Sequence, residues 1–158
     1  GKGVHSFYYD HTKNQFNILN PNILIPESTS EFSINSSYRR YWNSKIKKYI
    51  KNCEYGTDGV REKNFNMRWV GSLVADASRI FERGGIFLYP EDKREKNKSG
   101  RLRLTYEANP ISFLISQAGG KATNGSIDIL NVEVHEIHQR VPFIFGSKEE
   151  VEIFLNTN

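Results

Sequence analysis

Residues 101–120, RLRLTYEANPISFLISQAGG, restrict the fold of this chain more than any other stretch. Polar and apolar residues alternate over 101–107, which is the period of a half-buried strand. The Asn-Pro pair at 109–110 then gives the cap and first turn of a helix, which the glycine pair at 119–120 ends. A strand that leads into a helix in this way predicts a fold in which helices pack on a sheet.

The predicted strand would place its charged side chains in one row. Its apolar residues share one face, so Arg101, Arg103 and Glu107 lie on the other. A strand rises ~3.3 Å per residue, so the first and last of these residues are expected roughly 20 Å apart. Such a row is either a solvated surface or one wall of a groove for an elongated anionic ligand.

The rest of the chain continues the interleaving of strands and helices. Strands are expected at 4–9 and 15–19 (a hairpin), 31–35, 86–88, 121–123, 127–130 and 141–145. Helices are expected from residue 43 or 44 to Cys53, from Val70 to Phe81 with Val74 on the apolar face, and after Ser147, which with Glu150 forms a capping box. The charge-rich segment 91–100 is expected to be a solvated loop. We therefore predict one α/β domain over residues 1–158, a layered fold with a mixed β-sheet flanked by helices.

The composition is that of a globular protein and excludes several kinds of site. The 158 residues are 37% hydrophobic and 25% charged, with a formal net charge of +4. That charge admits anionic ligands, but scattered basic residues offset by 18 acids do not indicate nucleic acid. A single cysteine, Cys53, excludes an internal disulfide and a cysteine-rich zinc site, and favours a reducing cytoplasm. No apolar run is long enough to span a membrane and no signal sequence is visible.

The chain resembles the C-terminal half of class 1 fructose-1,6-bisphosphatase. The matching motifs are RWVGSLVADASRIFERGGIFLYP, GRLRLTYEANPISFLISQAGGKATNG, HQRVPFIFGSKEEVE, and EFSIN followed by Tyr38. The resemblance covers nearly the whole chain. It implies a magnesium-dependent sugar phosphatase of gluconeogenesis, with Mn²⁺ as a possible substitute, that is cytoplasmic and usually a homotetramer.

The resemblance also implies that much of the metal site lies elsewhere. The family's Asp-Pro-Leu-Asp-Gly-Ser metal motif belongs to its N-terminal half, and no such stretch occurs in these 158 residues. The chain starts with Gly-Lys-Gly without an initiator methionine, so we expect a fragment whose own N-terminal domain completes the site. Such a fragment is expected to be inactive alone.

Particular residues match the family's functional positions. Glu107 matches a metal-binding carboxylate, and Arg103 a catalytic arginine beside the reacting phosphate. Arg101 stands where the family has a lysine that contacts the sugar and the distal phosphate. A planar guanidinium with several donors there replaces the compact ammonium group of lysine. The remaining substrate-binding matches are Asn35, Tyr38, Trp69 (usually tyrosine) and Tyr89 in the phosphate pocket, Leu73 (often methionine) at the sugar, and Arg68, which reaches the neighbouring subunit's site.

The sequence leaves two alternative functions open and disfavours one metal site. Sedoheptulose 1,7-bisphosphate is an alternative substrate, because the pocket residues do not fix sugar length. A non-catalytic sugar-phosphate-binding or assembly module is an alternative for the isolated chain. His135 and His138 are expected to be core or interface residues rather than a metal pair, because their neighbours read as extended chain.

Overall fold

The computed structural model describes residues 2–157, apart from the side chain of residue 95. Its strands are β1 (Ser6–Asp10), β2 (Gln15–Asn20), β3 (Glu31–Ile34), β4 (Asn66–Met67), β5 (Ile86–Tyr89), β6 (Leu102–Arg103), β7 (Lys121–Thr123), β8 (Arg140–Val141) and β9 (Phe143–Gly146). Its α-helices are α1 (Ser44–Glu54), α2 (Leu73–Arg83), α3 (Asn109–Gln117) and α4 (Lys148–Leu155).

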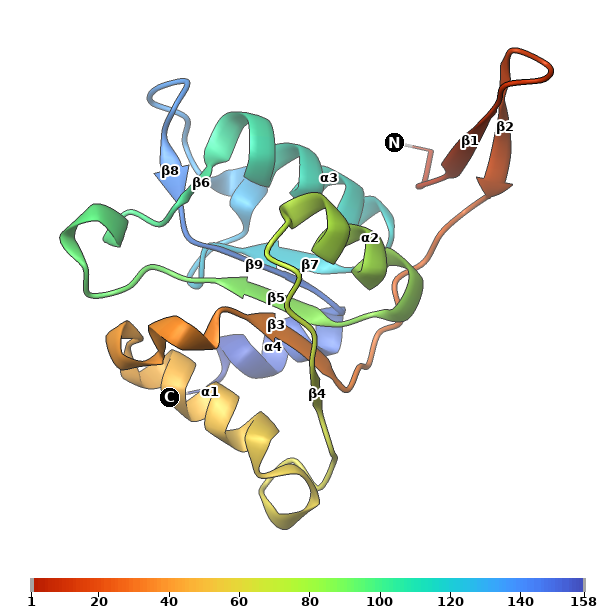
Figure 1. Cartoon of the computed structure of the whole chain (residues 1–158). Coiled ribbons are helices and arrows are strands. Elements are labelled where there is room, and N and C mark those ends of the chain that lie inside the picture. Colours follow the sequence, from red (N-terminus) through yellow and green to blue (C-terminus); the bar gives the residue numbers. More distant parts are fainter. Residues whose placement is uncertain (1, 158) are drawn as a thin grey trace.

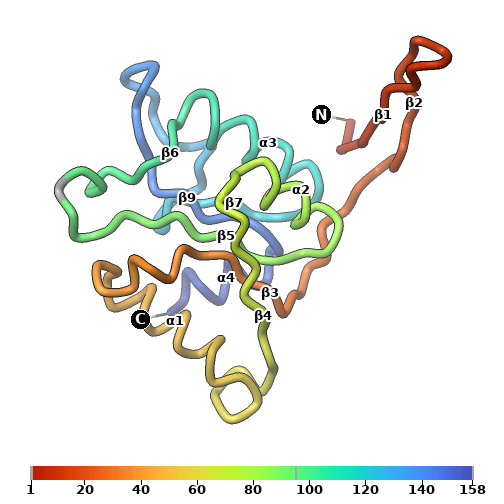
Figure 2. Tube along the Cα trace, in the orientation of Figure 1, coloured from red at the N-terminus to blue at the C-terminus, as the bar shows by residue number. Residues whose placement is uncertain are grey.

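The central sheet is mixed, as predicted. It has five strands in the order β4-β3-β5-β9-β7. Strand β3 runs parallel to β4 and β5, whereas β9 is antiparallel to both β5 and β7. The predicted hairpin is present as β1 and β2, and it projects away from the body of the molecule (Figure 2).

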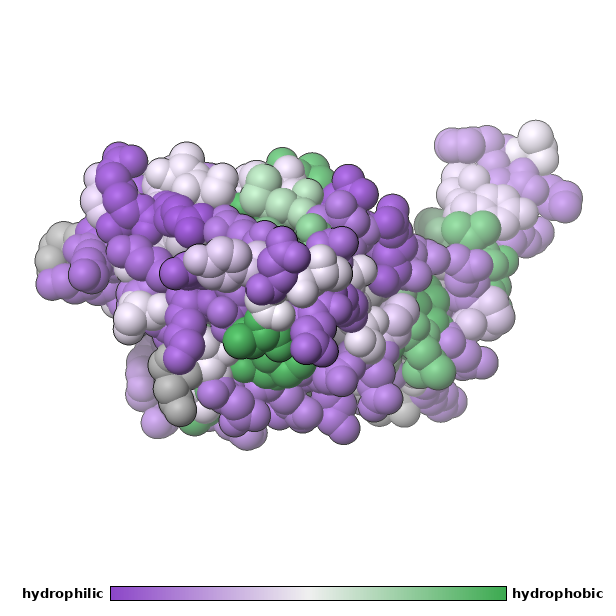
Figure 3. Space-filling view, turned by 90° about the horizontal axis from the view of Figure 1, so that it is seen from below, coloured by the Kyte–Doolittle hydropathy of each residue, from purple (hydrophilic) through white to green (hydrophobic). Residues whose placement is uncertain are grey.

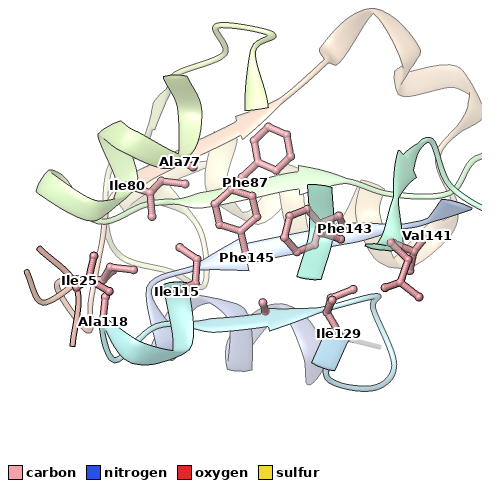
Figure 4. Close-up of a cluster of buried hydrophobic side chains, with 14 residues drawn as sticks. Ile25, Ala77, Ile80, Phe87, Ile115, Ala118, Ile129, Val141, Phe143 and Phe145 are labelled. Carbon is pink, nitrogen blue, oxygen red and sulfur yellow. The ribbon is translucent and has the colours of Figure 1, made fainter. Parts of the chain in front are cut away.

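Alternation along the central strands divides the core between the two faces of the sheet. On one face Phe87, Phe143 and Phe145 pack together beneath α2 and α3, which contribute residues such as Ile80 and Ile115 (Figure 4). The intervening residues of the same strands point to the opposite face, where α1 and α4 cover them (Figure 1). This period of two on buried strands creates the layered arrangement that the sequence predicted.

Helix α1 shows how local sequence defines an element. The side-chain oxygen of Asn43 accepts a hydrogen bond from the Ile46 amide and caps the first turn. The predicted apolar face is buried, including Tyr49 and Cys53, while the lysines between these positions stay outside. Accordingly, the surface seen from this side is mostly hydrophilic (Figure 3).

Helix α2 begins later than predicted. Leu73 is its first residue, so Val70 precedes the helix and is 61% exposed. Val74 lies within the helix but on its outer side, 71% exposed. The buried stripe instead runs through Asp76, Ala77 and Ile80, so both valines were wrongly placed on the apolar face.

The strand predicted over 101–107 is wrong beyond its first residues. Strand β6 covers only two residues, and a π-helical turn, Leu104–Ala108, follows it and continues into α3. Leu104 and Ala108 lie four residues apart and are both fully buried, so helical spacing prevails over the alternating pattern. Asn109 therefore lies inside the helical segment and does not cap it.

Two further local predictions are wrong, the first because of a local turn and the second because of a long-range contact. The segment 127–130 is not a strand; Asp128 caps a 3-10 turn over Ile129–Asn131. The capping box of α4 is also absent, because the Ser147 hydroxyl accepts a hydrogen bond from the Gly85 amide at 3.1 Å. None of the helices within residues 2–157 has the length and apolar run needed to cross a bilayer.

Candidate functional site

A small cavity forms where β3 and β5 end at the same edge of the sheet. The two strands are parallel and pair Ile34 with Leu88, which brings the following Asn35 and Tyr89 together. The turn after β3 adds Tyr38 to the lining. Figure 1 shows this turn and the loop after β5 on the same side of the sheet. Carboxyl ends of parallel strands are common places for ligand sites.

Two arginines cover the aromatic part of this cavity. The Arg101 guanidinium carbon lies 5.6 Å from the centre of the Tyr89 ring and 5.9 Å from that of Tyr38. The Arg94 guanidinium lies closer, 4.0 Å from the centre of the Tyr38 ring. Hydrogen bonding by Arg101, and then by Arg94, lowers the pKa of the Tyr38 phenol. The cavity is therefore a cationic pocket with phenol and amide groups that can contact an anion.

The two arginines leave little free space. The cavity volume is about 20 Å³, close to what one water molecule requires. Asp92 also contributes to its lining, and its carboxylate pairs with Arg94. A phosphate is larger than this, so part of the lining must move when a phosphate enters.

A second group of predicted residues lies behind Tyr89. The Trp69 indole stacks on Phe87 at an interplanar angle of 15° and contacts Tyr89 at a ring-centre distance of 5.8 Å. It supports Tyr89 from the side and is not part of the cavity lining. Leu73 packs against the same apolar core. The structure thus links Trp69 to the cavity through the Tyr89 ring.

Arg68, next to the indole, belongs to a charged cluster at the start of β3. Its Nε lies 3.6 Å from Glu31, a carboxylate that also pairs with Arg79 and Arg83. The Arg68 side chain is 47% exposed, so it is accessible from solvent.

Arg103 and Glu107 form a third group with a geometry that the sequence did not predict. Because the chain turns helical, they are one helical turn apart, and Arg103 Nε lies 3.1 Å from Glu107 Oε2. The same oxygen accepts a hydrogen bond from the Arg103 backbone amide at 2.7 Å. Glu107 thereby stabilises the first turn as a capping residue does. The extended row of charges ~20 Å long is replaced by a compact pair.

Glu107 cannot hold a divalent ion by itself. Within the described residues no three His, Cys, Asp or Glu side chains are grouped so that they could bind a metal. Mg²⁺ needs near-octahedral oxygen coordination, which one carboxylate and water molecules meet only with help from substrate or other protein oxygens. A divalent ion at Glu107 would therefore need further oxygen ligands besides this carboxylate.

Arg94 and Asp92 also line the cavity, although the segment 91–100 was predicted to be a solvated loop. In fact Asn97 in this segment is 1% exposed and donates a hydrogen bond to Asp92 Oδ2. The spacing of Asp92 and Arg94 was the available signal, because a carboxylate two residues before an arginine can order a loop.

His135 and His138 are both exposed and are therefore not core residues. His138 Nδ1 lies 2.9 Å from the Tyr106 hydroxyl, and no metal group includes His135 in the part of the chain that is described. Cys53 is buried, and burial raises the pKa of its thiol to about 12. A thiol in this environment is protonated and unreactive.

Comparison with known proteins gives one consistent result. The model of a family described as "Fructose-1-6-bisphosphatase, C-terminal domain" matches residues 25–157. Fructose-1,6-bisphosphatase class 1 from Hydrogenophilus thermoluteolus is 53% identical over 152 residues, and a class 1 enzyme from Methylibium petroleiphilum is 52% identical over 151. Each match covers 96% of this chain but 42% of the relative.

Proposed function

The chain belongs to the fructose-1,6-bisphosphatase family through its C-terminal domain, and on this premise we propose that it is the sugar-binding half of a phosphatase. The reaction is hydrolysis of the 1-phosphate of fructose 1,6-bisphosphate to give fructose 6-phosphate in gluconeogenesis. The observation that carries this proposal is the cavity where Asn35, Tyr38, Tyr89 and Arg101 meet. Cationic, phenolic and amide donors together suit a sugar phosphate.

The distal phosphate of the substrate binds in this cavity. The amide of Asn35 and the phenols of Tyr38 and Tyr89 donate to its oxygens, while Arg101 supplies positive charge beside the sugar. Trp69 keeps the Tyr89 ring in place, and Leu73 gives the sugar an apolar contact. Binding at this end fixes the position of the phosphate to be removed, which lowers the entropic part of the barrier.

Arg103 and Glu107 act at the reacting end. The Arg103 guanidinium neutralises charge on the transferring phosphoryl oxygens, and its pairing with Glu107 orients it. Glu107 is the ligand that this chain offers to Mg²⁺, or to Mn²⁺, which supplies Lewis-acid stabilisation and activates water when bound. The other metal ligands come from the protein's own N-terminal domain.

Arg68 has a role in assembly. Its side chain extends from the cluster of arginines around Glu31 and reaches the site of a neighbouring subunit in a homotetramer. Such a cytoplasmic enzyme needs neither a membrane nor nucleic acid as a partner.

The test joins this chain to the N-terminal part of the Hydrogenophilus thermoluteolus relative. With Mg²⁺, we expect the joined protein to release phosphate from fructose 1,6-bisphosphate, with a higher kcat/KM than for sedoheptulose 1,7-bisphosphate. The 158-residue chain alone should release none. Turnover by the chain alone would contradict the shared metal site, and a folded but inactive joined protein would favour a binding module. Higher efficiency on the longer sugar would change the assigned substrate.

A further inference from the structure

We propose that Arg94 is a specificity-determining residue of the distal pocket: it binds the terminal phosphomonoester together with Arg101 while Asp92 positions it. This inference rests on the proposed function, since it concerns the same cavity. Arg94 comes from a loop that the resemblance does not assign to the site.

The Asp92 carboxylate binds one edge of the Arg94 fork. Arg94 Nε donates to Asp92 Oδ1 at 2.9 Å, and Nη2 donates to Oδ2 at 2.5 Å. The ion pair therefore uses Nε and Nη2, and Nη1 lies on the other edge of the fork. Because a guanidinium is planar and has donors on two edges, it can hold the carboxylate and a phosphate oxygen together.

The loop holds this pair in one geometry. The Arg94 backbone amide and the Asn97 side-chain amide both donate to the Asp92 carboxylate, at 2.9 Å each. The guanidinium also lies over two rings, 4.0 Å from the centre of Tyr38 and 4.8 Å from that of Tyr41. A side chain ordered before binding loses less entropy when the ligand arrives, so Arg94 is prepared for an anion.

Arg94 is the residue that makes the net charge of the cavity lining positive. Asp92 offsets Arg101, so without Arg94 the lining would have no net charge. A phosphomonoester carries about −1.5 to −2 at neutral pH. Arg94 adds positive charge and also stands between the phosphate and the Asp92 carboxylate. Its removal would therefore have two costs, a lost donor and an exposed repulsive carboxylate.

If Arg94 both donates to the phosphate and shields it from Asp92, the variants should rank in affinity in an order that a purely structural role does not predict. Arg94→Met should weaken binding of fructose 6-phosphate to the chain about 10- to 100-fold, the effect of losing a charge-assisted hydrogen bond. Adding Asp92→Asn to that variant should restore part of the affinity, because the uncompensated carboxylate is gone. If Arg94 only ordered the loop, removing Asp92 as well would weaken binding further.

The experiment is calorimetric titration of the 158-residue chain with fructose 6-phosphate and, separately, with fructose. Lys93→Met is the matched control, because it removes an equal charge from an exposed neighbour and should change the Kd less than about threefold. Arg94→Lys, which keeps the charge without the fork, should be intermediate and serves if Arg94→Met does not fold.

Each outcome has one meaning. If the wild-type chain binds fructose 6-phosphate no better than fructose, the proposed pocket is wrong. If the wild type binds it but the folded Arg94 variants have the wild-type Kd, only the role of Arg94 is wrong. The same holds if the double variant binds more weakly than Arg94→Met.

Discussion

The buried Glu150 carboxylate allows a sharp prediction about stability. Its side chain is 2% exposed, and its two oxygens accept hydrogen bonds from Arg61 Nη1 and Nη2 at 2.8 Å each. The Tyr49 hydroxyl donates a third bond at 2.6 Å. This network joins α1, α4 and the loop after α1, and burial raises the pKa of the Tyr49 phenol well above its ordinary value.

Replacing Arg61 by methionine would leave the carboxylate buried without its cation. Breaking a buried pair in this way costs roughly 3–5 kcal/mol. For a domain of this size each kcal/mol lowers the Tm by about 2–4 °C, so we expect a decrease of roughly 6–20 °C. Thermal and urea unfolding followed by circular dichroism measure this change. The exposed pair of Arg39 and Glu54 provides the control, because Arg39→Met should cost at most about 1 kcal/mol.

A triple variant separates the unpaired charge from lost packing. Tyr49→Phe, Arg61→Met and Glu150→Met together remove every polar member of the network and keep similar volumes. Replacing a buried ion pair by apolar side chains often leaves stability unchanged. The free energy of unfolding of this variant should therefore lie within about 2 kcal/mol of the wild-type value. The reasoning is refuted if Arg61→Met costs less than about 1 kcal/mol, or if the triple variant is less stable than Arg61→Met.

Three further predictions follow from single positions. Gly146→Ala should destabilise the fold by at least about 3 kcal/mol, because the new Cβ would lie 1.9 Å from a backbone oxygen. Gly119→Ala meets no atom within 4 Å but has a φ of +80°, so in urea unfolding it is the control for backbone strain without a clash. Hydrogen bonding from Arg94 lowers the pKa of Asp92 from 3.8 to about 2, so the ionised carboxylate stabilises the fold above pH ~4 and this contribution is lost as pH falls towards 2. When the free energy of unfolding is measured against pH, Arg94→Met should lack this acid-dependent contribution, and a profile equal to that of wild type would contradict the prediction. Glu107→Gln should keep the bond to the Arg103 amide and the Tm, yet lower kcat of the joined phosphatase more than about 100-fold; near-normal turnover would remove Glu107 from the metal site.

Periodicity predicted the layers of the fold because the strands are buried on both faces. Phe143 and Phe145 point to one core while Ile144 points to the other, and the helices show equally regular spacing. The hydrophobic pattern was ambiguous where strand spacing and helical spacing fit the same residues. Leu102 and Leu104 fit a strand, but Leu104 also continues the helical stripe of α3, and burial favoured the helix.

Some of the residues that line the cavity were predictable, but their geometry was not. The resemblance gave Asn35, Tyr38, Tyr89 and Arg101, and these residues do lie around one cavity. Local sequence could not show that Arg94 folds back over Tyr38, because that contact joins residues 56 positions apart. Nor could it show that Ser147 and Glu150, a good capping box by spacing, bond to distant partners instead.

The loop over residues 91–99 is fixed at both of its ends. It leaves the sheet after Tyr89, and at its far end Gly100 lies against the Val141 backbone so closely that a Cβ there would be 2.1 Å from a carbonyl carbon. Sequence change between these anchors can therefore alter the cover of the pocket without moving Arg101 or the strands beneath it. For protein engineering, this segment is an exchangeable cassette: replacing it is a route to new ligand preferences on an unchanged scaffold.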